Sequence, residues 1–404
     1  MLRGFKSFQM TTFSRTASVV AMLSLTQLLG WGATFWMIAV TGPATVADLH
    51  LPLSIVMVGP TAMLIVMAII SWPLGRAFER FGARPIMTTG APIASVGLMI
   101  MGMAGGPTAY FLSWAMLGIA GACMLTAPAQ IAITEIAGER SRNALSVLIL
   151  AGGLTSTIMW PLTGILQAHW GWRTTALIYA ALLFFVCMPL HWYGLARNAG
   201  NKTKGEKLVR STSADLRKFI LLATSFAANG FFTWGFALTI IILFEAKGLD
   251  HTSALGAAAF IGIAQWAGRM TDLACGHRLS GLAMGLLGAA LFPASFIVLL
   301  VTNSFGGAVV FAILYGIASG ITAVARATLP LELFPAGAYA RSSARMSVPL
   351  NFAFATAPLA FTAIMTLASS QATLWLALSV SIFAFAKLLW LSVVYRKLTS
   401  EKTA

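Results

Sequence analysis

The chain consists of long apolar runs separated by short polar turns. A helix needs roughly 20 apolar residues to cross the ~30 Å hydrocarbon layer of a membrane. The runs are continuous rather than alternating, which argues against a closed β-barrel. The pattern predicts twelve membrane-spanning helices, near residues 17–40, 54–75, 86–104, 109–134, 144–166, 173–195, 218–244, 253–272, 281–301, 306–330, 343–367 and 372–395.

The first apolar run, from Ala17 to Val40, has an alternative interpretation as a secretory signal peptide. The run is too long for such a peptide and has no good small-x-small cleavage site. We therefore expect it to be retained as the first membrane helix.

Composition indicates the same class of protein. The chain is 58% hydrophobic and 9% charged, whereas a soluble domain carries about 25% charged residues. So few polar groups cannot cover a globule, and we expect an all-α membrane protein without a separate soluble domain. The cysteines, at positions 123, 187 and 275, show no metal-ligand spacing. We expect neither a metal nor a cofactor.

The basic residues collect in alternate loops. The opposite loops contain only Arg173 and Lys247. By the positive-inside rule this asymmetry predicts that both termini are cytoplasmic. The net charge of +15 is then explained by attraction to an anionic inner leaflet, and we expect the lipid bilayer rather than nucleic acid as the partner.

A charged turn occurs twice, about half a chain length apart. Gly75 to Arg84 and Gly268 to Arg278 both read G-R-x-x-acid, then a glycine, then an arginine. Trp31-Gly32 likewise has a counterpart in Trp234-Gly235, and Glu135 has one in Glu332. The repetition predicts duplicated membrane halves, as found in carriers. We expect one half at residues 1–196, a basic cytoplasmic linker at 197–217, and the second half at 218–404.

The first copy of this turn resembles the loop motif G-x-x-x-D-R-x-G-R-R of the major facilitator superfamily. It departs from that motif with Glu79 for the usual Asp and Ala83 for an Arg. The resemblance extends over essentially the whole chain. It implies two pseudo-symmetric six-helix bundles that face a central cavity and rock to give alternating access, in a bacterial inner membrane. It also implies that helices 1, 4, 7 and 10 line the cavity.

The repeated turns predict an inner gate. We expect Glu79 to pair with Arg341 or Arg345, and Asp272 to pair with Arg140 or Arg142. The alternative is that all are ordinary interfacial charges, each pair worth ~0–1 kcal/mol. The complete set of gate candidates is Gly75, Arg76, Glu79, Gly82, Arg84, Arg140, Arg142, Arg269, Asp272, Arg341 and Arg345.

Polar and aromatic residues at helical spacing give candidates for a substrate site. Residues spaced i, i+4, i+7 share one face of a helix, although small polar residues also serve helix–helix packing. The substrate-binding candidates are Gln27, Trp31, Thr34, Thr126, Gln130, Trp160, Asn229, Thr233, Trp234, Tyr315, Thr322 and Arg326.

Arg326 is an intramembrane charge and is therefore a functional candidate by default. It is placed to attract a carboxylate substrate; the alternatives are that it snorkels to the surface or pairs with Glu332. The acidic residues fall at span ends or in loops, so proton coupling is not evident.

The sequence contains no G-x-x-x-x-G-K-[ST] phosphate loop and no H-E-x-x-H motif. We therefore predict a secondary transporter and not an enzyme, working as a monomer on a small-molecule substrate. The aromatic and amide groups favour uptake of a neutral planar vitamin such as riboflavin. The alternatives are a monocarboxylate or organic-anion carrier using Arg326 or Arg269, and a drug exporter. A receptor, a membrane enzyme and a channel are less favoured.

Overall fold

The computed structural model describes residues 2–195, 213–275, 279–335 and 338–403. Those residues are almost entirely helical and contain no strand. Their contacts divide the chain into two units. Unit 1 comprises Met1–Leu208 and Gly337–Val348, and unit 2 comprises Val209–Ala336 and Pro349–Ala404.

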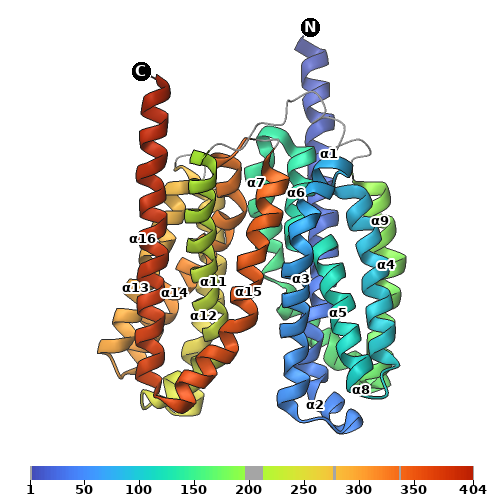
Figure 1. Cartoon of the computed structure of the whole chain (residues 1–404), viewed down its shortest axis with the longest axis vertical. Coiled ribbons are helices and arrows are strands. Elements are labelled where there is room, and N and C mark those ends of the chain that lie inside the picture. Colours follow the sequence, from blue (N-terminus) through green and yellow to red (C-terminus); the bar gives the residue numbers. More distant parts are fainter. Residues whose placement is uncertain (1, 196–212, 276–278, 336–337, 404) are drawn as a thin grey trace. The chain divides into compact units, whose positions relative to one another are not determined.

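Unit 1 is a helical bundle, and its residues 2–195 are coloured blue to green in Figure 1. Its buried core is centred on Tyr110 and Trp114 of the fifth helix and on Tyr179 of the eighth. The elements are α1 (Leu2–Trp31), a π-helical turn η1 (Gly32–Trp36), α2 (Met37–Leu49), α3 (Leu53–Phe81), α4 (Ala83–Gly102), α5 (Pro107–Met124), α6 (Thr126–Ala137), a 3₁₀ turn η2 (Gly138–Arg140), α7 (Ser141–Gly152), α8 (Thr155–Leu182), a second π-helical turn η3 (Leu183–Cys187) and α9 (Met188–Gly194).

Unit 2 is a second helical bundle, and its core is rich in phenylalanine. Phe232, Phe292, Phe296 and Phe311 are fully buried and pack edge-to-face or tilted against one another. The first turns of its fifth helix, up to Val348, belong to unit 1. The elements are α11 (Ser213–Ala246), α12 (His251–Cys275), α13 (Gly281–Val301), α14 (Phe305–Leu333), α15 (Tyr339–Leu367) and α16 (Ser370–Thr403).

Ten segments among the described residues are long and apolar enough to cross a membrane. One of them, Ser141–Gly194, contains two of the predicted spans, and its α8 portion is interrupted at Gly171, which has a φ of 76°. The predicted span 253–272 coincides with α12, which is not among the ten. The first span runs past its predicted end, through η1 to Leu49. Most of the predicted linker, residues 197–212, lies outside the described residues, and 213–217 form the start of α11.

A carboxylate meets the start of a neighbouring helix in each unit. In unit 1 the backbone N–H of Ala83, the first residue of α4, donates to Glu135 Oε1 at 2.9 Å. In unit 2 the N–H of Leu282, near the start of α13, donates to Glu332 Oε2 at 3.3 Å. Negative charge is favourable at a helix N-terminus. The two glutamates that the sequence pairs therefore make the same kind of contact in the two units.

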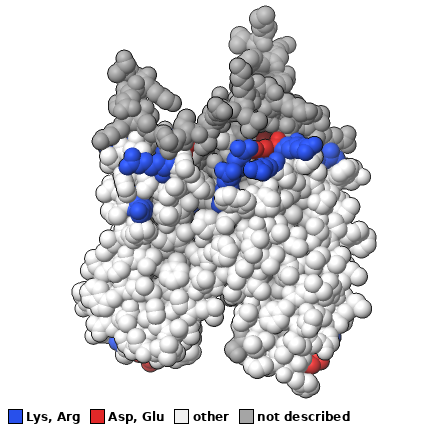
Figure 2. All heavy atoms as spheres, in the orientation of Figure 1, with Lys and Arg blue, Asp and Glu red and all other residues white. Residues whose placement is uncertain are grey.

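Basic side chains gather towards one end of each unit on the face shown in Figure 2. Arg173 and Lys247, the two basic residues of the opposite loops, each contact a helix end. Arg173 Nη1 donates to the carbonyl of Gly102, the last residue of α4, at 3.1 Å, and Lys247 Nζ donates to the carbonyl of Leu300 in α13 at 3.2 Å. Each cation thus meets the C-terminal end of a helix, where positive charge is favourable.

Candidate functional site

The loop motif places Glu79 in the last turn of α3. That helix ends at Gly82, whose φ of 76° is readily adopted by glycine and whose N–H donates to Phe78 O at 2.8 Å. The Glu79 carboxylate accepts a hydrogen bond from Arg341 Nη2, at the start of α15. Their side chains are 19% and 30% exposed, so the ion pair is partly shielded from water.

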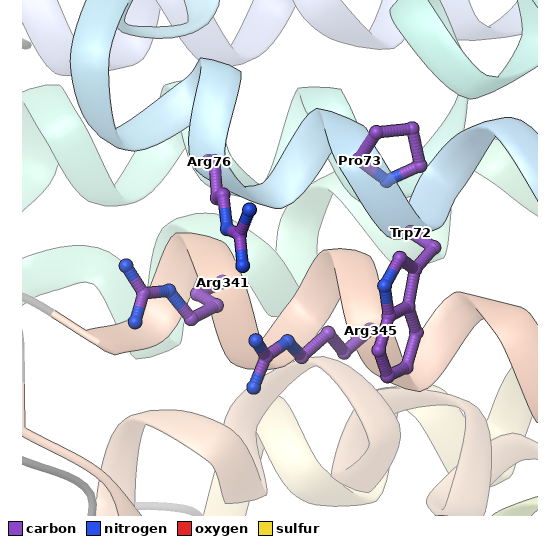
Figure 3. A pocket seen from close by; sticks show the side chains of 5 residues that line it. All are labelled: Trp72, Pro73, Arg76, Arg341 and Arg345. Atoms are coloured by element: carbon purple, nitrogen blue, oxygen red, sulfur yellow. The ribbon is translucent and has the colours of Figure 1, made fainter.

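A cavity of about 120 Å³ adjoins this ion pair (Figure 3), and it is lined by Trp72, Pro73, Arg76, Arg341 and Arg345. In that view Arg76 points from α3 towards the two arginines of α15. The guanidinium of Arg345 lies 5.2 Å from the centroid of the Trp72 ring, as in a cation–π contact. The lining therefore carries three positive charges beside the one carboxylate of Glu79.

The close approach of α3 to the start of α15 depends on a small residue. A Cβ on Gly75 would lie 3.4 Å from Ala344 Cβ and 3.5 Å from Arg341 Cα. A Cβ here would be in van der Waals contact with α15, so only a side chain longer than that of alanine would crowd the two helices. A small residue at this position of the motif is thus compatible with the contact that Glu79 makes with α15.

Other gate candidates have separate surroundings. Arg84 Nε donates to Trp192 O at 2.6 Å, and its guanidinium lies 4.1 Å from the Trp192 ring, so this arginine fastens α4 to α9. Arg140 is exposed in η2 and Arg142 is half-buried in α7. The side chain of Asp272 lies outside the described residues, and so does its predicted pairing with either arginine.

An aromatic row lies along the π-helical turn of the first span. We give this name to Trp31, Phe35, Trp36 and Trp160. Successive ring centroids in that order are 5.8, 5.2 and 5.7 Å apart, all edge-to-face. Trp31 Nε1 donates to Thr126 Oγ1 at 3.0 Å, which satisfies its indole N–H. Trp160 of α8 is 42% exposed and the other rings are half-buried, so the row has open aromatic surface.

The other polar candidates of unit 1 are more deeply placed. Gln27 is buried and its Nε2 donates to Met124 O at 2.8 Å. Thr34 Oγ1 donates to Gly30 O at 2.6 Å, within its own helix. Gln130 is 8% exposed. The predicted stripe Gln27, Trp31, Thr34 assumes α-helical periodicity, whereas η1 changes the register directly after Trp31.

The aromatic candidate of unit 2 stacks on a ring that the sequence analysis did not select. Trp234 of α11 lies face-to-face with Phe354 of α15, with ring centroids 4.5 Å apart and planes at 19°. A Cβ on Gly230, one turn earlier, would lie 2.5 Å from Phe354 Cε1. The missing side chain at Gly230 therefore leaves room for this ring.

Several hydroxyl candidates of unit 2 donate to backbone carbonyls of the same or a neighbouring helix. Thr233 Oγ1 donates to Asn229 O at 2.9 Å, and Thr322 Oγ1 donates to Ala318 O at 2.8 Å. Tyr315 donates its hydroxyl to Thr233 O at 3.3 Å. Backbone carbonyls thus accept from all three hydroxyls, and Asn229 is buried, at 4% exposure.

Arg326 lies in α14 with its guanidinium 5.7 Å from the centroid of Phe354. Its Nη1 is buried and has no hydrogen-bond partner among the described residues. Glu332, the partner considered from the sequence, directs a carboxylate oxygen to the N–H of Leu282 instead. Arg269 of α12 is close enough for its like charge to act on Arg326.

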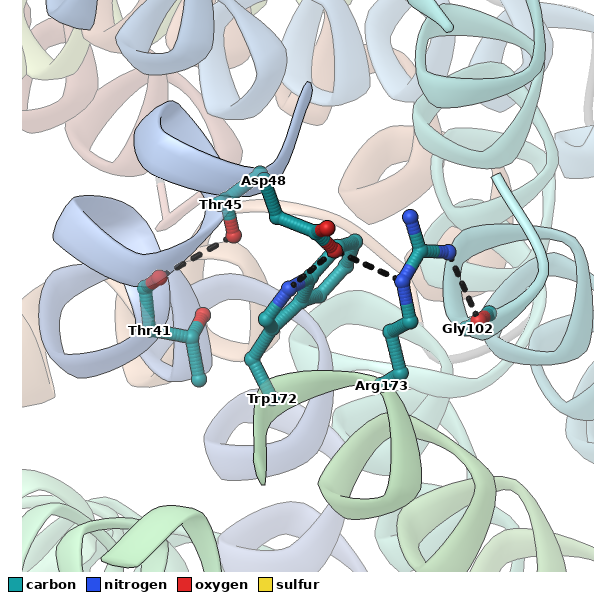
Figure 4. Close-up of polar contacts among 6 residues, drawn as sticks. All are labelled: Thr41, Thr45, Asp48, Gly102, Trp172 and Arg173. Atoms are coloured by element: carbon teal, nitrogen blue, oxygen red, sulfur yellow. Dashed lines mark hydrogen bonds and ion pairs between the residues drawn. The ribbon is translucent and has the colours of Figure 1, made fainter. Parts of the chain in front are cut away.

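The sequence analysis missed a polar cluster that joins three helices (Figure 4). Asp48 Oδ2 accepts hydrogen bonds from Trp172 Nε1 at 2.9 Å and from Arg173 Nε at 2.7 Å, while Arg173 also reaches Gly102. The cluster ties α2 to α4 and α8. The sequence signal for this cluster was Asp48 at the end of one span and Arg173 before another. Their separation along the chain gave no indication that the two side chains would meet.

Comparison with known proteins identifies the family. The sequence profile described as Major Facilitator Superfamily matches residues 22–268. The chain belongs to the Major Facilitator Superfamily. The fold agrees with that of another member: the crystal structure of the human organic anion transporter MFSD10 (TETRAN) superimposes with a TM-score of 0.70, covering 93% of this chain and 99% of that one at 14% sequence identity.

Bacterial members of the Major Facilitator Superfamily share sequence with part of the chain. The multidrug resistance protein MdtG of Salmonella choleraesuis is 30% identical over 157 residues, which is 38% of each protein. MdtG of Klebsiella pneumoniae is 33% identical over 135 residues, 33% of this chain and 32% of that protein. The match spans less than half the length of these relatives. The family and the apolar helices together make the chain a multi-pass membrane protein of this superfamily.

Proposed function

We propose that this transporter exports small amphipathic aromatic compounds across a bacterial inner membrane. The observation that carries the proposal is the aromatic row on η1. A carrier of the family needs a place where a solute rests during the conformational change. Partly exposed tryptophans offer one to flat organic molecules, because ring stacking adds about 0.5–1.5 kcal/mol beyond area burial.

The position of the row supports a binding role. Single π-helical turns inside α-helices frequently mark functional sites. Here the turn carries Phe35 and Trp36, and it follows directly on Trp31. The hydrogen bond from Trp31 to Thr126 would hold that indole ring in a fixed orientation. Broad aromatic surface with few fixed polar partners favours a range of substrates over a single one.

Export is favoured over uptake by the relatives. The proteins that share sequence with the chain are named as multidrug resistance proteins. The riboflavin hypothesis receives no support from the comparisons. The amphipathic aromatic class keeps the stacking chemistry that motivated that hypothesis.

The mechanism we propose uses two halves, residues 1–196 and 218–404, joined by the linker 197–217, with both termini in the cytoplasm. Glu79 and Arg341 would form part of the inner gate, with Arg76 and Arg345 beside them. Their partial burial supports this role, because an ion pair shielded from water contributes more than an exposed one. The protein would act as a monomer, since the binding and gating groups come from one chain.

The test is transport of a fluorescent aromatic substrate into inside-out vesicles, where export appears as accumulation in the lumen. Trp36→Ala and Trp160→Ala should each lower the transport efficiency by about fivefold, which corresponds to the loss of ~1 kcal/mol of stacking. Trp36→Phe should restore most of the loss. Trp375→Ala is the matched control, because Trp375 is 54% exposed on α16 and lies outside the row.

Row variants that transport as well as the Trp375→Ala control would refute the assignment of the row to substrate. Accumulation of substrate outside inside-out vesicles rather than within them would refute export.

A further inference from the structure

Arg326 is a half-buried cation inside unit 2, and one of its donors, Nη1, is buried. Arg326 lies within the apolar segment Phe305–Leu333, which is long enough to span a membrane. Charged residues are expensive there and persist mainly for function. The guanidinium presents N–H groups in a fixed fork and has no acceptor of its own. Nη1 finds no hydrogen-bond partner among the described residues.

The surroundings of Arg326 increase the cost of this arrangement. The charge of Arg269 acts on it with the same sign. The carboxylate nearest in sequence, Glu332, accepts from the N–H of Leu282. Phe354 offers its ring to the guanidinium at 5.7 Å, which is a weaker compensation than an anion. An anion placed at Nη1 would relieve both the open donor and the repulsion.

A second unfilled donor lies on the helix that carries Phe354. Asn351 of α15 is 3% exposed, and its Nδ2 has no hydrogen-bond partner among the described residues. It lies three residues before Phe354, and residues three apart share one face of a helix. The face of α15 that carries Phe354 therefore also carries an open amide donor.

The remaining group is aromatic. Phe354 stacks on Trp234 with a centroid separation of 4.5 Å. An open guanidinium, an open amide N–H₂ and a pair of stacked rings are the groups that together recognise an aromatic acid. A carboxylate accepts at several lone pairs and matches the planar fork of arginine. A cationic solute would be repelled by Arg326, and a neutral one would leave its Nη1 unfilled.

We propose that Trp234, Arg326, Asn351 and Phe354 form an anion subsite for the carboxylate, or a similar planar acidic group, of an aromatic substrate. The inference rests on the proposed export of aromatic compounds and specifies its substrate class. The ring of the substrate contacts the aromatic pair, and its acidic group accepts hydrogen bonds from Arg326 and Asn351. The transporter thereby prefers amphipathic anions over neutral molecules of the same shape.

The experiment compares 2-naphthoate with 2-naphthamide, which share a ring system and differ in charge. Binding to the purified full chain in detergent is followed by quenching of tryptophan fluorescence, and efflux is measured in inside-out vesicles. Wild-type protein should bind the carboxylate about 10- to 100-fold more tightly, the range expected for a charge-assisted hydrogen bond.

Variants assign the preference to the subsite. Arg326→Gln should bring the affinity for 2-naphthoate down to that for 2-naphthamide and leave the latter unchanged. Arg326→Lys, which keeps the charge and loses the fork, should retain part of the preference. Asn351→Leu should reduce it by a smaller factor. Arg217→Gln is the control. Arg217 lies near the start of α11, and its guanidinium contacts the ring of Trp390 in α16 rather than that of Phe354.

Equal binding of the two compounds by wild-type protein, or a preference that survives in Arg326→Gln, would overturn the subsite. Export of both compounds at equal rates would also overturn the subsite, but it would leave the export proposal intact. A preference abolished by Arg326→Gln without efflux of either compound would uphold the subsite and refute export. Thermal unfolding shows whether each variant is folded. If Arg326→Gln does not fold, the comparison of the two compounds is made with Arg326→Lys.

Discussion

Glu135 and Glu332 each present a carboxylate to the first turn of a neighbouring helix. The acceptor distances differ, at 2.9 Å to Ala83 N and 3.3 Å to Leu282 N. The backbone N–H groups at a helix start lack partners within the helix, and an anion there also interacts favourably with the helix dipole. The shorter contact should therefore contribute more to stability.

Replacing these glutamates tests that expectation. Glu135→Gln keeps an acceptor and removes the charge, and should lower the free energy of unfolding by about 1 kcal/mol. Glu332→Gln should cost less, because its hydrogen bond is longer. Thermal unfolding in detergent measures both variants. An equal or larger effect at Glu332 would show that the two contacts are not graded by distance.

Among the elements, α2, α4 and α8 are fastened by the cluster around Asp48. Its two donors differ in burial: Trp172 is 5% exposed, whereas the side chain of Arg173 is 36% exposed. An exposed ion pair contributes ~0–1 kcal/mol, but a buried N–H that loses its acceptor costs about 1–3 kcal/mol. The indole contact, not the ion pair, should therefore dominate the stability of the cluster.

This reasoning predicts an order of effects. Asp48→Ala should lower the free energy of unfolding by about 1–3 kcal/mol, because it strands the Trp172 N–H. Arg173→Gln should cost less than ~1 kcal/mol. Trp172→Phe in the Asp48→Ala background should recover part of the loss. Chemical or thermal unfolding gives the three values, and a larger loss in Arg173→Gln would contradict the order.

For the whole molecule, the inner gate should control the rate of interchange between its states. Glu79→Gln removes the carboxylate that Arg341 contacts. We expect interchange to accelerate by about fivefold, or ~1 kcal/mol, the upper range for a partly exposed pair. Single-turnover counterflow measures the rate. The control is Arg80→Gln, whose arginine is exposed and does not line the cavity.

The counterpart measurement is the accessibility of a cysteine at Ala344, which is 2% exposed beside Gly75. In the Ala344→Cys background, Glu79→Gln should raise its labelling rate. Unchanged labelling together with unchanged counterflow would refute a gating role for the pair.

The sequence predicted the class of the molecule well, because lipid imposes apolar runs of known length and the loop motif is specific to the family. It predicted side-chain roles less well. Thr34 and Thr322 lie at suitable spacing but donate to their own helices, a common alternative for threonine. Asn351 and Phe354 were missed because their significance depends on which helices pack against α15. The partner of Asp48 is likewise fixed by packing, since Trp172 is 124 residues away.

The π-helical turn η1 also governs how the first span can be compared with its relatives. A π-helical turn holds one residue more than the α-helical turn it replaces, since its hydrogen bonds run from i to i+5. A homologue without that extra residue would align with a single gap between Trp31 and Met37. Aligned identical residues before the gap and after it would then lie on two different faces of the helix. Substitutions transferred between such homologues should therefore be chosen separately on the two sides of η1, and an insertion or deletion here would change substrate range more than most point mutations.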